Sequence, residues 1–307
     1  MSDDACAAAG SRTVAVATAA QLTEALADAR PGDRIALADG TYAGRFVAMA
    51  SGTSGQPIAL CGTRRAVLQG ATVDAGYGFE LEGGFWVLSG FRVTGSQKGI
   101  VLDGASHNLL VGLEVDHIGQ EGIHFRRASS HNTLARSTVH DTGIGSGAAD
   151  KGFGEGVYIG SAQRNWRLYG DDGGPDRSDD NQILDDQLGP HTAAENLDIK
   201  EGTTGGLVRG NRFDGTGMSG EHAADSWVDV KGNGYRIENN RGAHALLDGF
   251  QTHVVVDGWG NDNAFTGNAM SDVPGYGIRV ASKSTGTRVS CSNALRGGAG
   301  VSNIACR

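Results

Sequence analysis

Short stretches in which apolar and polar residues alternate recur along most of the chain. From Gly78 onward one phrase returns in varied form, as GFELEG, GIVLDG, GIHFRR, GVYIGS, NLDIKE, WVDVKG, GFQTHV and GIRVAS. The phrases begin at Gly78, Gly99, Gly122, Gly156, Asn196, Trp227, Gly249 and Gly277. Their second and fourth residues are mostly apolar, which is the period-two pattern of a strand with one buried face. A phrase that returns every 21 to 40 residues predicts a solenoid in which each coil contributes one such strand.

The predicted fold is therefore all-β, a single right-handed parallel β-helix whose coils each contain brief strands. Asn108, Asn132 and Asn233 recur after a strand between the phrases. Asparagines in such positions either stack as a ladder inside the solenoid or serve as ordinary turn residues. We expect the outward strand faces of successive coils to form one long groove.

The segment before the first phrase predicts a cap for the open end of the solenoid. Thr18 can cap a short helix that runs to Ala29, and a turn and a strand follow. An uncovered terminal coil would expose both core and strand edge. We expect one domain over residues 1–307, with the cap and first strands in about 1–45, and coils in 46–307 that carry inserted loops near 141–155 and 166–195.

Two outward columns of the predicted groove carry paired charges in the middle coils. Because neighbouring coils lie about 4.8 Å apart, Asp198 should stack beside Asp229, and Lys200 beside Lys231. Stacked carboxylates repel one another unless something compensates them. One remedy is Ca²⁺, a cofactor that takes six to eight oxygen ligands; the alternative is that the lysines already neutralise the acids. The expected metal ligands are Asp198, Asp229, Glu195 and Asp225.

The paired lysines also favour a catalytic role. Each ammonium group should depress the pKa of the other, and a lysine brought towards neutral pH can act as a general base. The alternative reading is an exposed lysine that provides solubility and edge protection. The expected catalytic residues are Lys200, Lys231, His124 and Tyr158. The two longest spacings precede Gly156 and Asn196, so the inserted loops should flank these coils on the binding face.

Planar and cationic side chains should extend this face to either side. The side chains that we expect to bind substrate are Arg126, Trp227, Gln251, His253 and Arg279. Their composition suits stacking on sugar rings and pairing with uronate carboxylates. For Trp227 the alternative is plain packing at the edge of a coil.

Charge and cysteine content narrow the possible partners. The formal net charge of -9 argues against a nucleic-acid partner reached through bulk charge. No run of 18 apolar residues predicts a membrane span. The 50 glycines indicate many tight turns. Four cysteines lie near the two ends, Cys6 and Cys61 towards one and Cys291 and Cys306 towards the other, which suggests two terminal disulfides and secretion. The opening MSDDACAAAG is typical of a mature secreted N-terminus to which Met has been added; the alternative is a cytosolic protein with buried thiols.

The segment AENLDIKEGTTGGLVRGNRFDGTG resembles the central coils of the chondroitinase B and alginate lyase family, within the pectin-lyase-like superfamily of parallel β-helices. The opening ALADARPGDRIALADGTYAG is similar to the N-terminal cap of those enzymes. The resemblance implies that Lys200 is a Brønsted base and that Glu195 and Asp198 belong to the acidic region that holds Ca²⁺. The arginine that assists in that family is replaced by Lys231 one coil further on.

This resemblance implies a secreted polysaccharide lyase that cleaves a uronic-acid-containing polysaccharide by β-elimination. Lys200 would take the proton at C5, and the departing sugar would receive a proton from Tyr158 or His124. A first alternative is a glycoside hydrolase that uses Asp198 and Asp229, and a uronate epimerase would share the proton abstraction. A second is a non-catalytic carbohydrate-binding or adhesive solenoid. We expect an acidic polysaccharide as partner, no nucleic acid, no membrane, and a monomer.

Overall fold

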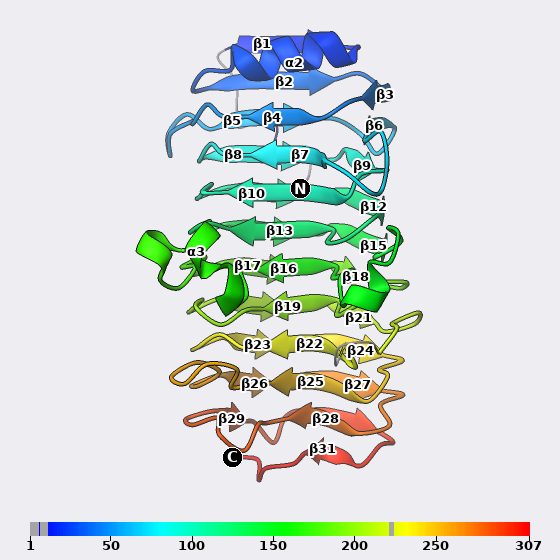
Figure 1. Cartoon of the computed structure of the whole chain (residues 1–307), viewed down its shortest axis with the longest axis vertical. Coiled ribbons are helices and arrows are strands. Elements are labelled where there is room, and N and C mark those ends of the chain that lie inside the picture. The colour runs from blue at the N-terminus through cyan, green and yellow to red at the C-terminus, as the bar shows by residue number, and fades with distance from the viewer. Residues whose placement is uncertain (1–5, 7–11, 221–223) are drawn as a thin grey trace.

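The computed structural model describes Cys6 and residues 12–220 and 224–307, and it is a stack of coils (Figure 1). Parallel strands of successive coils form three sheets among these residues, of 11, 10 and 10 strands. The first sheet contains β1 (Arg12–Val16), β2 (Asp33–Leu37), β5 (Ile58–Cys61), β8 (Trp86–Ser89), β11 (Leu109–Val111), β14 (Thr133–Ala135), β17 (Gln182–Leu184), β20 (Leu207–Arg209), β23 (Arg236–Glu238), β26 (Ala264–Thr266) and β29 (Arg288–Val289). The prediction of a right-handed parallel β-helix is confirmed.

The other two sheets complete each coil. One, which we call the groove sheet, contains β4 (Phe46–Ala48), β7 (Tyr77–Leu81), β10 (Lys98–Asp103), β13 (Ile123–Arg126), β16 (Val157–Ile159), β19 (Leu197–Ile199), β22 (Ser226–Val230), β25 (Asp248–Thr252), β28 (Tyr276–Arg279) and β31 (Gly300–Ser302). The remaining one contains β3 (Gly40–Ala43), β6 (Ala66–Gln69), β9 (Arg92–Thr94), β12 (Glu114–Ile118), β15 (Thr138–Thr142), β18 (Gln187–Leu188), β21 (Arg212–Asp214), β24 (Arg241–Ala243), β27 (Ala269–Ser271) and β30 (Ala294–Arg296).

The repeated phrases form the strands of the groove sheet, and their apolar residues stack in the interior. Ile100 pairs in register with Ile123, and Leu102 pairs with Phe125. All four side chains are fully buried. The same alternation therefore gives each coil an apolar inner face and a polar outer face, which positions the groove residues.

A helix covers the N-terminal end of the stack, as predicted (Figure 1). It is α2 (Ala19–Ala27), which ends two residues before the predicted Ala29. The side chain of Thr18 accepts a hydrogen bond from the backbone N–H of Gln21, so this residue is the expected N-cap. Leu22 and Leu26 are buried and face the first coils.

Two disulfides join Cys6 to Cys61 and Cys291 to Cys306, one near each end of the chain. This agrees with the expected pair of terminal disulfides. Of the helices that the structure describes, none combines the length and the apolar character that a membrane span requires.

Buried asparagines form ladders at the turns between sheets. Asn108 donates from its side chain to Asn132, and Asn132 donates to Asn181, over distances of 3.0 and 3.1 Å. A second ladder joins Asn211, Asn240, Asn268 and Asn293. Asn233 belongs to neither ladder, because its side chain donates to the backbone of Gly258. These ladders satisfy buried backbone N–H groups and hold adjacent coils in register.

Two insertions project beside the middle coils. The first contains η1 (Ala149–Lys151), and the second contains η2 (Gln163–Asn165), α3 (Trp166–Tyr169), which projects from one side of the stack (Figure 1), and η3 (Asp171–Gly173). Asp176 anchors the second insertion, because its buried carboxylate accepts from two backbone N–H groups, those of Arg127 and Ala128, and from the hydroxyl group of Ser161. This residue is a structural acceptor, so it does not act as a solvated charge.

Candidate active site

The outward residues of the groove sheet line up in the predicted columns. Along one column Tyr158 pairs in register with Asp198, Asp198 pairs with Asp229, and Asp229 pairs with Gln251. Four coils thus bring residues from distant parts of the sequence onto one face. The column continues to Arg279 in the next coil.

An open cleft of about 820 Å³ lies over the middle of this column. It is lined by the outward residues of β13, β16, β19 and β22 together with both insertions. The lining residues outside those strands include Lys151, Phe153, Arg164, Asn165 and Tyr169. The insertions therefore wall the cleft, as the sequence predicts for loops on a binding face.

Lysines and aspartates at the cleft floor are tightly paired. The Nζ atom of Lys200 forms an ion pair with Asp198. Nζ of Lys231 lies 2.7 Å from Oδ1 of Asp198 and 2.9 Å from Oδ2 of Asp229. Asp229 also accepts from the hydroxyl of Ser226 at 2.8 Å. At Asp229 the lysine therefore neutralises the carboxylate, which is the arrangement that the sequence analysis gave as the alternative to a bound Ca²⁺.

The expectation that a lysine of this pair has its pKa lowered towards neutral pH is wrong. Burial alone would lower the pKa of Lys200, but the carboxylates of Asp198, Glu155 and Glu195 outweigh it and raise that pKa. The pKa of Lys231 is also raised, because Asp198 and Asp229 outweigh both burial and the repulsion from Lys200. Carboxylates form ion pairs with both ammonium groups, and opposite charges favour the charged form.

Three buried acids form the strongest candidate for a metal site. Glu155, Glu195 and Asp198 each offer an oxygen, and these atoms all lie within 4.8 Å of one another. Burial, and then the charges of Glu121 and Asp198, raise the pKa of Glu155 to about 7. Burial and the same kind of repulsion raise the pKa of Glu195 well above its ordinary value. A hard cation with oxygen ligands would relieve this repulsion, so the residues fit Ca²⁺.

Two of the expected metal ligands lie outside this acidic triad. Burial would raise the pKa of Asp229, but the ammonium group of Lys231 outweighs it and lowers that pKa, and Nε2 of His253 lies 3.1 Å from the same carboxylate. Asp225 accepts a hydrogen bond from Gln251 at 2.6 Å and does not line the cleft.

Glu155 is the member of the acidic triad that the sequence analysis missed, and a signal for it exists. The residue immediately before the phrase is Glu121 at β13, Glu155 at β16 and Glu195 at β19. The three glutamates are buried in successive coils. If each phrase is extended by one residue at its start, the three glutamates align with one another in the sequence.

His124 and Tyr158 lie in contact beside the lysines. Their rings meet edge to face, with centroids 4.6 Å apart. Nε2 of His124 lies 3.0 Å from the carbonyl oxygen of Gly160, which can only accept, so this nitrogen carries the proton. Burial, and then the charge of Lys98, lower the pKa of His124 to about 3. The imidazole is therefore neutral, and it cannot act as the predicted proton donor near neutral pH.

Tyr158 remains as the candidate proton donor. Burial, and then the charge of Asp198, raise the pKa of its hydroxyl group well above the ordinary value. Nζ of Lys200 lies 4.9 Å from the centroid of its ring. None of the residues that the structure describes hydrogen-bonds this hydroxyl group.

The five expected substrate-binding residues lie in four different places. Trp227 is wrong as a groove residue: it is fully buried, and its indole N–H donates to the backbone of Ala243. Its ring fills the space that Gly242 leaves, since a Cβ at Gly242 would lie 2.3 Å from it. The chain therefore turns this large aromatic side chain into the core.

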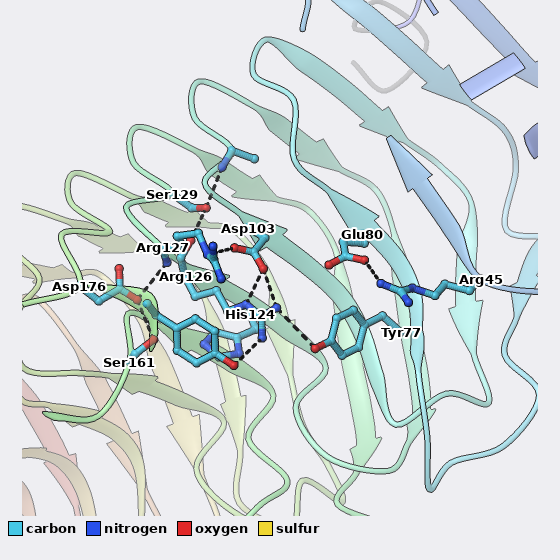
Figure 2. A network of polar contacts seen from close by, with 12 residues as sticks. Arg45, Tyr77, Glu80, Asp103, His124, Arg126, Arg127, Ser129, Ser161 and Asp176 are labelled. Carbon is cyan, nitrogen blue, oxygen red and sulfur yellow. Dashed lines mark hydrogen bonds and ion pairs between the residues drawn. The ribbon is translucent and has the colours of Figure 1, made fainter. Parts of the chain in front are cut away.

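Of the other four, His253 lines the cleft. Gln251 and Arg279 lie beyond it, where Gln251 donates to Asp225 and Asp248. Arg126 lies on the N-terminal side and is only 5% exposed (Figure 2). Its guanidinium group is bound by Asp103, so it supports the residues around it and faces little solvent.

Comparison with known proteins identifies similar chains. A family model described as "Pel9A-like, right handed beta helix region" matches residues 3–170. Pectate lyase L of Dickeya chrysanthemi is 32% identical over an alignment of 136 residues, and the match covers 38% of this chain and 31% of that protein. The match therefore spans about a third of the length of that relative.

Two solved structures resemble the whole coil stack. The crystal structure of alginate lyase from Paenibacillus sp. str. FPU-7 is 40% identical, with a TM-score of 0.85, and the match covers 96% of this chain and 100% of that one. The crystal structure of pectate lyase Pel9A is 17% identical, with a TM-score of 0.70, and the match covers 97% of this chain and 82% of that one. The second resemblance concerns the fold alone.

Proposed function

We propose that this chain, which belongs to the family of Pel9A-like right-handed β-helices, is a polysaccharide lyase that cleaves a uronic-acid-containing polysaccharide by β-elimination. One observation carries the proposal: a lysine, a tyrosine whose hydroxyl group has no hydrogen-bond partner among the described residues, and a buried acidic triad line the same cleft on adjacent coils. They are Lys200, Tyr158 and the triad of Glu155, Glu195 and Asp198. Two similar proteins bear the names alginate lyase and pectate lyase.

Lys200 is the base in this proposal. Its amine takes the proton from C5 of the uronate, the electron pair forms the C4–C5 double bond, and the C4–O4 bond breaks. The carboxylates around Lys200 hold it protonated in the free cleft, since they raise its pKa. Lys200 can accept a proton only after something offsets the negative charge of these carboxylates and lowers its pKa.

Tyr158 supplies the proton that the departing O4 needs. Its hydroxyl group stays protonated because its pKa is raised, which suits a donor. His124 holds the ring of Tyr158 by an edge-to-face contact and is itself fixed by Gly160. His124 is thus a positioning residue.

The acidic triad in the cleft favours a divalent cation. Five buried carboxylates line the cleft, and three ammonium groups beside the groove sheet oppose them, together with Lys151 and Arg164 of the insertions. The carboxylates are Glu121, Glu155, Glu195, Asp198 and Asp229, and the ammonium groups are those of Lys98, Lys200 and Lys231. The acidic triad is where we place Ca²⁺, which would offset the carboxylates beside Lys200 and stabilise the charge that develops on the uronate.

The alternative of a glycoside hydrolase through Asp198 and Asp229 is less well supported. A retaining mechanism needs one of its two carboxyl groups protonated as the general acid. Lys231 contacts both aspartates, and the lowered pKa of Asp229 keeps it ionised. If the protein only bound a carbohydrate without cleaving it, Lys200, Lys231 and the hydroxyl group of Tyr158 would have no evident role in the cleft.

We further propose that the protein is secreted and acts as a monomer. The two disulfides support an oxidising compartment. An acidic polymer outside the cell is also the substrate that an open groove on the flank of a solenoid can accept.

A panel of uronans with and without Ca²⁺ tests the proposal. The protein is incubated with pectate, alginate, glucuronan and glycosaminoglycans, and the unsaturated product is followed by ultraviolet absorbance. We expect a Ca²⁺-dependent rise that disappears in Lys200→Ala and persists in Lys283→Ala, a matched change at an exposed lysine away from the cleft. New reducing ends without absorbance would instead identify a hydrolase, and silence in both assays would favour a binding protein.

A further inference from the structure

A row of alternating arginine and tyrosine side chains lies on the groove face, on the N-terminal side of the cleft (Figure 2). We call it the arginine row, and its members are Arg45, Tyr77, Arg126, Tyr169 and Arg127. The guanidinium carbons of Arg45 and Arg126 lie 5.2 and 5.4 Å from the ring centroid of Tyr77. Those of Arg126 and Arg127 lie 4.6 and 5.8 Å from that of Tyr169. All four distances are within the range of cation–π attraction.

Arg126 is the rigid centre of the arginine row. It is buried, and its Nη2 and Nε donate to Oδ2 of Asp103 at 2.6 and 3.1 Å. Its remaining N–H groups approach the hydroxyl groups of Tyr169 and Tyr77 at 3.3 and 3.4 Å. These contacts fix both tyrosines, and the tyrosines in turn hold the outer arginines.

The outer arginines present their guanidinium groups to solvent. The side chains of Arg45 and Arg127 are each 57% exposed. Arg45 forms one ion pair through Nη2, with Glu80, and Arg127 forms one through Nε, with Asp103. A guanidinium group has five N–H donors in a planar fork, so each keeps donors that can bind a carboxylate in bidentate fashion.

The opposite end of the groove carries carboxylates where the N-terminal side carries arginines. Beyond the cleft, Gln251 lies between the carboxylates of Asp225 and Asp248. Arg279 lies 3.9 Å from Asp248 and is half exposed. An acidic polymer is repelled by such carboxylates, whereas the arginine row brings three cations onto the groove face, opposed by the carboxylates of Glu80, Asp103 and, near Arg45, Glu82.

We propose that Arg45 and Arg127 form carboxylate-binding subsites for the uronan, on the N-terminal side of the reaction centre, with Arg126 as their positioning residue. The substrate is then held more strongly on this side than beyond His253. From β4 to β16 there are four coil steps, about 19 Å, which is room for several sugar residues. This inference rests on the proposed function, since it takes the substrate to be an acidic polysaccharide.

The double variant Arg45→Gln with Arg127→Gln tests the subsites. We expect KM for a long uronan to rise about tenfold for each charge-assisted pair lost. The value of kcat on the shortest cleaved oligosaccharides should stay unchanged, because the reaction centre is intact. The oligosaccharide products should also change in length. The matched control is Arg288→Gln, which removes an exposed arginine from β29 on another sheet.

Binding of the intact polymer separates this inference from the proposed function. Calorimetric titration with the uronan, and with its carboxyl-reduced form, needs no turnover. Weaker binding of the uronan alone by the double variant supports the subsites even if no polymer is cleaved. Unchanged KM, products and binding in the double variant of an active enzyme would overturn the subsites and leave the lyase intact. If the double variant does not fold, Arg45→Gln alone is held to the same criteria.

Discussion

Replacing one buried acid of the triad should stabilise the protein while it destroys the proposed metal site. The pKa of Glu155 is raised from 4.5 to about 7 by burial and by the charges of Glu121 and Asp198. At 1.36 kcal/mol for each pKa unit, ionised Glu155 destabilises the folded state by about 3 kcal/mol. This penalty is absent below the unfolded pKa, grows as the pH rises from the unfolded pKa to the folded pKa, and is fully present above the folded pKa. Glu155→Gln removes the charge at similar volume and should abolish it.

Urea unfolding in chelating buffer measures this difference. At about pH 8 the free energy of unfolding of Glu155→Gln should exceed that of the parent by about 3 kcal/mol, and at about pH 4 the two should nearly coincide. Glu24→Gln, on the exposed side of α2, is the control and should change stability by less than about 0.5 kcal/mol at either pH. A Glu155→Gln variant that is equally or less stable at the higher pH would refute the reasoning.

Calcium gives the same comparison a second readout. If the triad binds Ca²⁺, a concentration one hundred times the dissociation constant should stabilise the parent by about 2.7 kcal/mol at the higher pH. Glu155→Gln has lost a ligand oxygen and should gain much less. Equal stabilisation of both proteins would place the ion elsewhere.

Three further changes test the base, the proton donor and the N-terminal disulfide. Lys200→Ala should lower kcat about a hundredfold to ten-thousandfold with little change in binding of the polymer, and unchanged kcat would exclude it as the base. Tyr158→Phe keeps the ring contact with His124 but removes the donor; its loss of kcat should shrink on substrates with better leaving groups, and a constant loss would argue against proton donation. Removing the disulfide in Cys6→Ser with Cys61→Ser opens a 55-residue link and should lower the free energy of unfolding by about 4 kcal/mol, whereas an unchanged urea midpoint would contradict this account.

The register of the groove could be predicted because it follows from local pattern alone. Alternation fixes which residues point outward, and stacking one phrase on the next aligns Asp198 with Asp229. The cap helix could be predicted equally well, because Thr18 and the apolar spacing after it specify a helix from local sequence alone. In a solenoid each coil contacts only its neighbours, so local signals suffice for much of the architecture.

The charge state of the site could not be predicted from the same pattern. The expected effect of Lys231 on Lys200 considered one column only, whereas the structure brings Glu155 and Glu195 from a second column towards the same ammonium group. Trp227 failed for a related reason. The Trp227 side chain points inward because Gly242, on another sheet, leaves space for its ring. The residues of the WVDVKG phrase alone do not indicate that this space exists.

The buried carboxylates of the proposed reaction centre do not stabilise the fold. An isolated buried carboxylate destabilises a folded protein, and Glu155 and Glu195 are both held at raised pKa values in the cleft. The solenoid tolerates this because the core and the asparagine ladders stabilise each coil on the other side of the strand. Substitutions that neutralise the triad should therefore be recovered readily in a selection for stability and should be lost in a selection for activity, which is the trade-off expected of a functional site.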